Sequence, residues 1–489
     1  MKDVLTPLEM RTVDMNTEYN HIPTIVLMEN AGSRIANYIV RNFSDKRKVS
    51  IYSGTGGNGG DGFVIARHLL NYDFKVRLFL LAKPEAIRNK DSMTNFKSIK
   101  IIAETDKNLS LNVITDSSMV KPDNSDIIVD AILGTGVNGK LREPASSAID
   151  VINNSPAIVL SVDVPSGMDP LTGNVYDKCV VAAQTLTLHK VKTGLLGAHA
   201  GFTGKISVFD IGIPRVSEEY VGSGDLLRIK SRLSNSHKGE NGSVLIVGSN
   251  PDYVGAVIFA GRAALVGGVD LVYIVAPESS ADVIKQDNPE FIVRSVSGDV
   301  LSVDAYDDIM ELADRVDSVL LGSGAGLDNK TGELFSKLLD TLEGIVVLDA
   351  DALKLVDKNS LKENVIVTPH NYEFKQLFGV DVPDDLEGKV ELISSLSEDF
   401  HTTVLLKGVV DVIAFDGDYK LNRTGNAGMT IGGTGDVLAG LVLAFSSKLS
   451  PFEASFLAVF KLCAACDKLY INGSYRIEDI LKELQKGGV

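Results

Sequence analysis

The apolar residues of this chain recur in two patterns that alternate along its length. Short apolar runs of strand length begin with residues 48–52, and stretches with helical spacing, such as Met28, Ala31 and Ile35, accompany them. Comparable runs stand at residues 75–82, 125–136, 157–167, 180–188, 205–211, 271–275, 318–321, 346–353, 365–374 and 404–408. Strands that alternate with helical segments predict an α/β fold class built on parallel sheets.

The chain is long enough for more than one hydrophobic core. Its 489 residues exceed one ordinary domain and predict two or three. Residues 213–235 lack a sustained hydrophobic period, so we predict a linker there, between a domain at residues 1–212 and a domain at residues 236–489.

Composition indicates a globular protein, with 44% hydrophobic and 23% charged residues. The first residues have no apolar core of the length that a signal peptide needs, and no stretch approaches the length of a membrane span. We therefore expect a soluble, cytoplasmic protein that makes no membrane contact. The CxxC at Cys463 and Cys466 lies in an apolar helical stretch without a second pair, which predicts two core residues rather than a zinc site.

Charge is unevenly distributed between the predicted domains. Residues 1–212 carry 23 Lys and Arg against 22 Asp and Glu, a net +1, whereas residues 213–489 carry 25 against 42, a net −17. Nucleic-acid binding draws on clustered basic charge, so we expect no nucleic-acid partner for the C-terminal part.

The most informative stretch is residues 425–440, GNAGMTIGGTGDVLAG, where a glycine-rich loop leads into an apolar helix. The N–H groups of Gly433, Thr434 and Gly435 can converge on one point in front of the positive end of that helix, which favours phosphate oxygens. A carboxylate beside phosphate would be repelled, so we interpret Asp436 as a base aimed at a substrate hydroxyl. The alternative is a glycine-rich turn with Asp436 stabilised by the helix dipole.

This stretch matches neither a P-loop nor a protein-kinase glycine loop. It resembles the anion hole of ribokinase-like enzymes and, more narrowly, the C-terminal domain of the NAD(P)H-hydrate dehydratases, which usually have proline at the position of Ala427. The stretch HKGENGSVLIVG, which opens the second domain, resembles the same family.

A second glycine loop, SGTGGNGGDG, follows the first strand and contains GxGxxG at Gly54, Gly56 and Gly59. The next strand ends in Lys83-Pro84 instead of the acidic residue that holds a ribose, so the ordinary dinucleotide fingerprint fails. Asn58 and Asp61 instead suit a hard cation or a sugar phosphate. The loop resembles the YjeF N-terminal domain, the NAD(P)H-hydrate epimerase, which usually has asparagine where this chain has Gly57.

Polar side chains follow several of the predicted strands. In the first domain Asp130, Asp163 and Ser166 stand at strand ends, and in the second Asp349, His370 and Lys407 do so. Ligands of parallel sheets bind at the carboxyl ends of strands, so each set is predicted to share one edge. The alternative is that these residues only cap the turns that follow.

The resemblance implies a bifunctional enzyme with two three-layer α/β/α domains, the first Rossmann-like and the second ribokinase-like. In the first, Asp163 would exchange protons at a carbon next to nitrogen, and Lys140 is a further candidate. Residues implied to contact the hydrate there are Gly57, Asn58, Gly59, Gly60, Asp61, Gly134, Thr135, Gly136, Val137, Asn138, Gly139, Lys140 and Asp163. Residues implied to bind potassium are Asn58, Asp130 and Ser166.

In the second domain the resemblance implies that ADP or ATP, with Mg²⁺, phosphorylates the C6 hydroxyl of the hydrate, and that ring-nitrogen electrons then expel the phosphate. The implied hydrate contacts are Ala256, Gly324, His370 and the base Asp436. The implied nucleotide contacts are Lys407, Gly408, Val409, Val410, Asp411, Gly433, Thr434 and Gly435.

The implied substrates are the hydrates NADHX and NADPHX, and a homo-oligomer is expected. Two other interpretations stay open at this point. The C-terminal domain is alternatively a ribokinase-type small-molecule kinase, and the N-terminal domain is alternatively a non-catalytic binding module.

Overall fold

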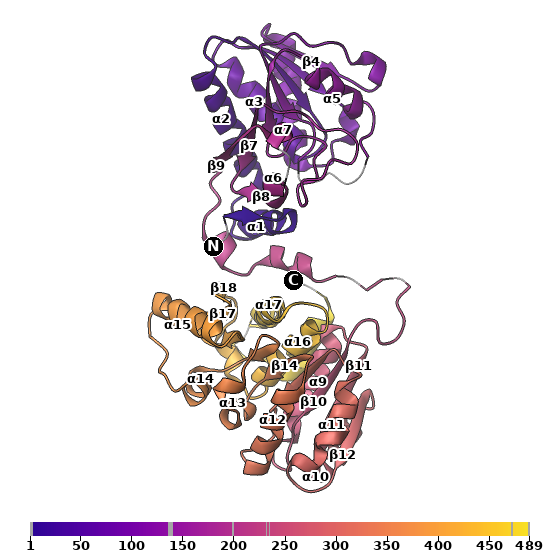
Figure 1. Ribbon diagram of the computed structural model, residues 1–489, viewed down its shortest axis with the longest axis vertical. Coiled ribbons are helices and arrows are strands. Elements are labelled where there is room, and N and C mark those ends of the chain that lie inside the picture. Colours follow the sequence, from indigo (N-terminus) through magenta and orange to yellow (C-terminus); the bar gives the residue numbers. More distant parts are fainter. Residues whose placement is uncertain are drawn as a thin grey trace. The chain divides into compact units, whose positions relative to one another are not determined.

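The computed structural model describes residues 3–134, 140–197, 200–230, 232, 233, 235–470 and 473–487. The chain divides between Glu218 and Glu219 into two compact units, each with its own sheet and core (Figure 1). The predicted α/β class with two layered domains is confirmed.

The N-terminal unit is built on a seven-stranded parallel sheet in the order β4-β3-β2-β5-β6-β7-β9. Both faces of the central strands are covered, so a strand such as β5, IIVDA, is apolar almost throughout and fully buried. The strands are β2 (Lys48–Ser53), β3 (Lys75–Leu80), β4 (Leu109–Val113), β5 (Ile127–Ala131), β6 (Ile158–Val162), β7 (Gln184–Leu188) and β9 (Lys205–Phe209). A separate parallel pair joins β1 (Val4–Leu5) to β8 (Val191–Lys192).

Helices form the outer layers of this unit. Side chains of α2, α3 and α4 pack with one face of the sheet, and those of α5 pack with the other, because alternate residues such as Ile51 and Tyr52 point to opposite faces. The helices are α1 (Pro7–Tyr19), α2 (Thr24–Asn42), α3 (Gly57–Leu70), α4 (Lys90–Thr105), α5 (Ala145–Asn153), α6 (Thr193–Gly197), α7 (Ala200–Thr203) and α8 (Val216–Glu219).

The C-terminal unit is built on a nine-stranded sheet in the order β12-β11-β10-β13-β14-β15-β16-β17-β18. It is parallel from β12 to β16, and the last two strands are antiparallel. The strands are β10 (Ser243–Val247), β11 (Leu271–Pro277), β12 (Phe291–Val296), β13 (Ser318–Leu321), β14 (Ile345–Leu348), β15 (Val365–Val367), β16 (Thr403–Leu406), β17 (Asp411–Phe415) and β18 (Asp418–Asn422).

Two helical layers sandwich this second sheet. Helices α9, α16, α17 and α18 share one core with it, and α11, α12, α13, α14 and α15 share the other. The helices are α9 (Val254–Gly267), α10 (Glu278–Asp287), α11 (Tyr306–Ala313), α12 (Asn329–Thr341), α13 (Ala352–Leu355), α14 (Asn371–Phe378), α15 (Leu386–Asp399), α16 (Thr434–Ser446), α17 (Pro451–Leu469) and α18 (Ile477–Gln485).

The segment 213–235 is shared between the two units. Residues up to Glu218 belong to the first unit. In the second, Val221 N–H donates to the Leu421 carbonyl at 2.8 Å, and Asp225 is fully buried. Part of this segment therefore packs as an element of the C-terminal unit.

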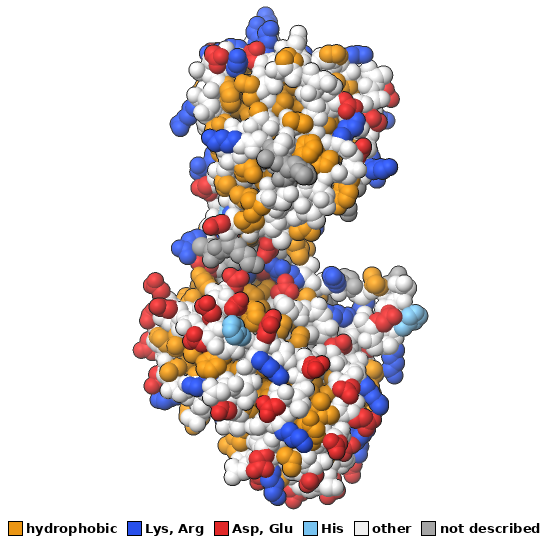
Figure 2. Space-filling view, in the orientation of Figure 1, with side chains coloured by type: hydrophobic (Ala, Val, Ile, Leu, Met, Phe, Trp, Pro, Cys, Tyr) orange, Lys and Arg blue, Asp and Glu red, His pale blue; other side chains and the backbone are white. Residues whose placement is uncertain are grey.

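Asp and Glu side chains are spread over the visible face of the C-terminal unit (Figure 2), as its net charge requires. Among the described residues, no helix combines the length and the apolar character needed to cross a membrane.

Candidate functional sites

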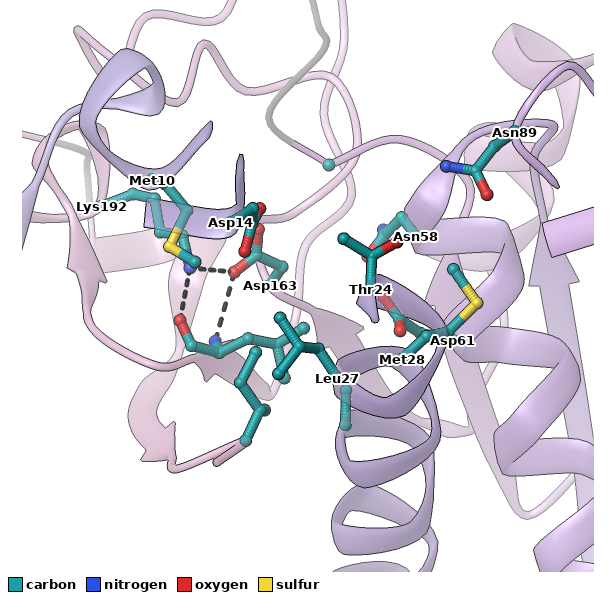
Figure 3. A pocket seen from close by; sticks show the side chains of 14 residues that line it. Met10, Asp14, Thr24, Leu27, Met28, Asn58, Asp61, Asn89, Asp163 and Lys192 are labelled. Carbon is teal, nitrogen blue, oxygen red and sulfur yellow. Dashed lines mark hydrogen bonds and ion pairs between the residues drawn. The ribbon is translucent and has the colours of Figure 1, made fainter. Parts of the chain in front are cut away.

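A cavity of about 260 Å³ opens in the N-terminal unit (Figure 3). Four residues expected from the sequence line it: Asn58, Asp61, Gly134 and Asp163. Its remaining wall comes from α1, α2, Asn89 before α4, Lys192 of β8, and the chain at the ends of β7 and β9. Several of these side chains are apolar: Met10, Leu27, Met28, Ala31, Leu188 and Ile211. The volume is slightly below the roughly 300 Å³ at which pockets for drug-sized ligands begin.

Asp163 follows β6 and has an unusual backbone conformation for a non-glycine residue, with φ of 65°. Residues held in this region cost on the order of 1–3 kcal/mol and cluster at functional sites. Its Oδ1 accepts from Leu188 N–H at 3.2 Å and from the Thr187 hydroxyl at 3.3 Å, and forms an ion pair with Lys192. Lys192 is only 1% exposed and also donates to the Leu188 carbonyl at 2.6 Å.

Two further carboxyl groups reach the same cavity. Burial raises the pKa of Asp14 to about 7, with Lys192 opposing this shift and Asp163 adding to it. Burial also raises the pKa of Asp61 well above its usual range, and the charges of Asp163 and Asp14 add to that effect. The cavity thus collects three carboxyls around one buried ammonium.

Sequence reasoning missed Asp14 and Lys192. Asp14 lies on α1 next to Val13 and four residues after Met10, and both of these residues are buried. A carboxyl group on the apolar face of a helix is the sequence signal that could have indicated Asp14. Lys192 follows β7 after a short turn, and its burial results from the pairing of β8 with β1. No local pattern reports that pairing.

The glycine loop places Asn58 in the first turn of α3. Both polar atoms of its amide are buried and have no hydrogen-bond partner among the described residues. Gly134 lies beside it, since a Cβ on Gly134 would be 3.4 Å from the Asn58 side chain. Gly57 borders open space, whereas a Cβ on Gly59 would meet the Gly54 carbonyl oxygen at 2.1 Å, and one on Gly60 the Ser92 hydroxyl at 2.5 Å.

Asp130 and Ser166 are joined directly. The Ser166 hydroxyl donates to Asp130 Oδ1 at 2.5 Å, and the Ser166 N–H donates to Oδ2 at 2.9 Å. The Ser161 hydroxyl and the Ile132 N–H also donate to this carboxylate, so its four acceptor positions are filled. Burial raises the pKa of Asp130. Of the potassium ligands expected from the resemblance, Asn58 offers an amide oxygen without a partner in the described part of the chain, which suits a cation. The Ser166 hydroxyl donates to Asp130 and accepts from Leu133 N–H at 2.9 Å, and Asp130 supports Ser166.

Five residues of the expected hydrate loop lie outside the described residues: Thr135, Gly136, Val137, Asn138 and Gly139. Lys140 follows them and is exposed.

In the C-terminal unit the GTGD stretch forms the start of α16. Gly433 is its N-cap with φ of 99°, and a Cβ there would lie 2.8 Å from the Phe259 ring, so only glycine fits. Thr434, Gly435 and Asp436 make up the first helical turn, which leaves their N–H groups without partners inside the helix. An anion-binding helix N-terminus and a carboxyl group thus occupy the same turn.

Lys407 lies at the centre of a buried charge cluster beside this turn. Its Nζ is 3.1 Å from Asp349 Oδ1 and 3.7 Å from Glu373 Oε2. A Cβ on Gly435 would lie 3.9 Å from the same Nζ. Burial works against the ammonium, but Asp349 and Glu373 raise the pKa of Lys407. Burial raises the pKa of Asp436 to about 7, Asp349 adds to the shift, and Lys407 opposes it.

A second cavity, of about 610 Å³, adjoins this cluster. Of the expected nucleotide residues, Lys407, Gly408, Val409, Asp411, Thr434 and Gly435 line it. Gly408 N–H donates to Asp411 Oδ1 at 2.9 Å, which fixes the turn after β16, and burial raises the pKa of Asp411 to about 6. The Val409 side chain is 98% exposed, whereas that of Val410 packs against the core under α11 to α15.

The remaining expected residues flank the cluster. Gly324 touches α9, because a Cβ on it would lie 3.1 Å from that of Ala256. His370 is the N-cap of α14, where its Nδ1 accepts from the Tyr372 and Glu373 N–H groups at 3.1 and 3.3 Å. Lys407 N–H donates to the Pro369 carbonyl at 2.9 Å, so β15 and β16 bring His370 and Lys407 to the same edge of the sheet, as predicted.

Comparison with known proteins agrees with this two-unit arrangement. Residues 24–194 match the family model of the YjeF-related protein N-terminus, and residues 244–486 match that of NAD(P)H-hydrate dehydratase. In the Bacillus subtilis ADP/ATP-dependent NAD(P)H-hydrate dehydratase, co-crystallized with ATP/Mg²⁺, the similarity is 27% identity over 54% of this chain and 96% of that chain, with a TM-score of 0.45.

Full-length relatives are more similar. A bifunctional NAD(P)H-hydrate repair enzyme from Methanothermobacter thermautotrophicus is 45% identical over 94% of this chain and 89% of its own length. The enzyme of the same name from Pyrobaculum aerophilum is 41% identical over 93% of this chain and 92% of its own. The one from Archaeoglobus fulgidus is 37% identical over 99% of this chain and 98% of its own. The chain therefore belongs to the bifunctional NAD(P)H-hydrate repair enzymes.

Proposed function

We propose that the two units of this repair enzyme carry separate reactions: the N-terminal unit interconverts the R and S epimers of NADHX and NADPHX, and the C-terminal unit dehydrates the S epimer at the expense of ADP or ATP. The observation that supports this most directly is the placement of a carboxyl with a raised pKa, Asp436, on the helix turn whose free N–H groups suit phosphate.

In the dehydratase, the Gly433, Thr434 and Gly435 N–H groups bind the phosphoryl group and stabilise charge that develops during transfer. Asp436 accepts the proton of the C6 hydroxyl as that oxygen attacks phosphorus. The phosphorylated oxygen is a better leaving group, so electrons of the ring nitrogen expel phosphate, and loss of a neighbouring proton restores the reduced cofactor.

The nucleotide would occupy the 610 Å³ cavity, whose wall combines apolar side chains such as Met429 and Leu438 with Lys407 and the turn at Gly408. Magnesium that accompanies a nucleotide is usually held by phosphates and one or two carboxylates, and Asp349 and Glu373, the carboxylates that pair with Lys407, would be available to it. When bound, it would neutralise phosphate charge.

In the epimerase, Asp163 acts as the base that accepts and returns a proton at the hydrated C6 group. The 260 Å³ cavity holds the hydrated ring, and its apolar wall excludes water. Asn58 and Ser166 would hold potassium, which would supply a fixed positive charge beside the loop, and Asp130 orients Ser166.

The decisive experiment incubates the full chain with a mixture of NADHX epimers and either ADP or ATP. We expect both epimers to disappear, with recovery of the absorbance of NADH and release of free phosphate. Accumulation of a phosphorylated hydrate without recovery of NADH would instead establish a small-molecule kinase.

Lys407→Ala should weaken nucleotide binding, because it removes a buried positive charge from the cavity wall. Loss of a hydrogen bond to a charged group costs about 1.5–3 kcal/mol, which corresponds to about 10- to 100-fold in affinity. Isothermal titration calorimetry with ADP and ATP measures this, and Lys330→Ala, an exposed change on α12, is the control. Equal affinities of both variants would assign Lys407 a purely structural role.

Dehydration of the S epimer should accelerate as pH rises through about 7, because Asp436 must be ionised to accept a proton and burial raises its pKa to about that value. Rates at saturating nucleotide and hydrate across this range give the profile. A rate that already reaches its plateau near the usual pKa of an aspartate would contradict the assignment of Asp436.

A further inference from the structure

The epimerase cavity contains a second carboxyl in a position to transfer a proton. Asp14 reaches it from α1, and Asp163 reaches it from the end of β6 (Figure 3). The two carboxyls interact electrostatically with each other and with Lys192, which places all three around one space. No hydrogen bond from another described residue occupies the Asp14 carboxyl.

Epimerisation at C6 needs two proton transfers in the same step. The hydrated carbon carries a hydroxyl and is bonded to the ring nitrogen, so its configuration can invert without oxidation if the C6–N1 bond opens and closes again. Opening requires a base at the hydroxyl and an acid at the nitrogen. One carboxyl group is either a base or an acid at a given moment, so a second carboxyl allows both transfers to occur together.

The contacts of the two carboxyls differ in a way that divides these roles. Asp163 accepts hydrogen bonds from Leu188 N–H and the Thr187 hydroxyl and forms an ion pair with Lys192, so three of its contacts donate to it or carry positive charge. Asp14 faces Asp163 and Asp61, both acidic, and its one cationic neighbour, Lys192, is already paired with Asp163. Like charges so close cannot all ionise, and a proton on Asp14 relieves the repulsion.

We propose that Asp14 is the general acid of the epimerase and works opposite the base Asp163. In the opening step Asp163 takes the C6 hydroxyl proton, the C6–N1 electron pair moves to nitrogen, and Asp14 protonates that nitrogen, leaving an aldehyde at C6. Rotation about the C5–C6 bond exposes the other face of the carbonyl. The nitrogen then adds back, returns its proton to Asp14, and the oxygen regains one from Asp163.

Asp61 is the competing candidate and suits the role less well. It is 7% exposed, and burial raises its pKa well above the usual range, which opposes the loss of its proton in each catalytic cycle. Asp14 has a pKa of about 7, near the pH at which it must both give and regain a proton. This proposal rests on the epimerase function proposed above.

The test uses the full chain with excess nucleotide and follows consumption of the R epimer by chiral chromatography. Asp14→Asn keeps the shape of the protonated acid but cannot donate its proton, so epimerisation should slow about 10²-fold or more. In the unmodified protein the epimerisation rate should fall as pH rises through about 7, and the variant should lose that fall. Asp14→Glu should restore part of the epimerisation rate and part of its pH dependence. Glu18→Gln, an exposed change on the same helix, is the matched control and should change neither.

An Asp14→Asn variant that epimerises as fast as the unmodified protein with the same pH profile would overturn the proposal. The thermal midpoint of Asp14→Asn should not fall, because the substitution removes a buried carboxyl whose ionised form is disfavoured. If the variant nevertheless fails to fold, the pH profile of the unmodified protein is the test. An epimerisation rate that does not fall as pH rises through about 7 would then overturn the proposal by itself. Failure of the unmodified protein to consume the R epimer faster than it epimerises spontaneously would refute the epimerase function instead.

Discussion

Asp436→Asn should abolish dehydration while nucleotide binding stays largely intact. The variant keeps the shape of the side chain and the N–H groups of the helix turn but cannot accept a proton, and loss of a general base costs about 10²- to 10⁴-fold in rate. Removing a carboxylate beside phosphate also relieves repulsion, so affinity for ADP or ATP should be unchanged or higher. Turnover is measured as recovery of NADH absorbance, and affinity by calorimetry.

The thermal stability of Asp436→Asn shows whether a loss of turnover comes from the missing base or from a loss of folding. Burial raises the pKa of Asp436 above its value in the unfolded chain, so the folded protein loses stability as pH rises from the usual titration range of an aspartate to about 7, and the loss is constant above that. The Asn variant should therefore melt no lower than the unmodified protein in that range. Asp340→Asn, an exposed change on α12, is the matched control. Near-normal turnover of Asp436→Asn would remove this residue from the mechanism.

Asp163→Ala should slow consumption of the R epimer to the rate of spontaneous epimerisation and leave dehydration of the S epimer unchanged. Asp163 and Asp436 lie in different units, so substitutions of the two residues should have independent effects. Chiral chromatography of both epimers during turnover measures each reaction in one sample. Asp177→Ala, an exposed change, is the control for the first unit.

Asp163→Ala also leaves Lys192 buried without its partner, and breaking a buried ion pair costs about 3–5 kcal/mol. A double variant, Asp163→Asn with Lys192→Met, removes both charges and should recover most of the thermal stability. It should still lack epimerase activity, because a stable fold does not replace the base. R-epimer consumption at the normal rate in either variant would mean that a group other than Asp163 is the base of the epimerase.

Most interior strands of both sheets could be predicted because they are continuous apolar runs covered on both faces. The strands without a prediction include β4, β12 and β18, which lie at sheet edges. In β18, DYKLN, only the last two residues are buried, so its pattern is that of a polar loop. Edge strands owe their conformation to the partner strand, which no local pattern reveals.

The residues of the candidate sites also differ in whether the sequence predicts them. Residues in glycine loops or at the ends of apolar strands, such as Asp163, Asp436 and Lys407, could be identified because parallel topology brings strand ends together. Lys192 could not, and the only local signal for Asp14 was its place on the apolar face of α1, because α1 and β8 reach the cavity through contacts distant in sequence. The filled acceptor positions of Asp130 likewise depend on Ser161 and Ser166 and emerge only in three dimensions.

Burial gives Asp436 and Asp14 the same pKa, about 7, although they lie in different units. In the roles proposed above, Asp436 must lose its proton to act as a base and Asp14 must hold its proton to act as an acid, so the two reactions would respond to pH in opposite directions. In alkaline surroundings the R epimer would persist in the damaged cofactor pool while the S epimer is cleared. In acidic surroundings the two epimers would still interconvert while dehydration of the S epimer slows, so the rate of repair would depend on the dehydratase.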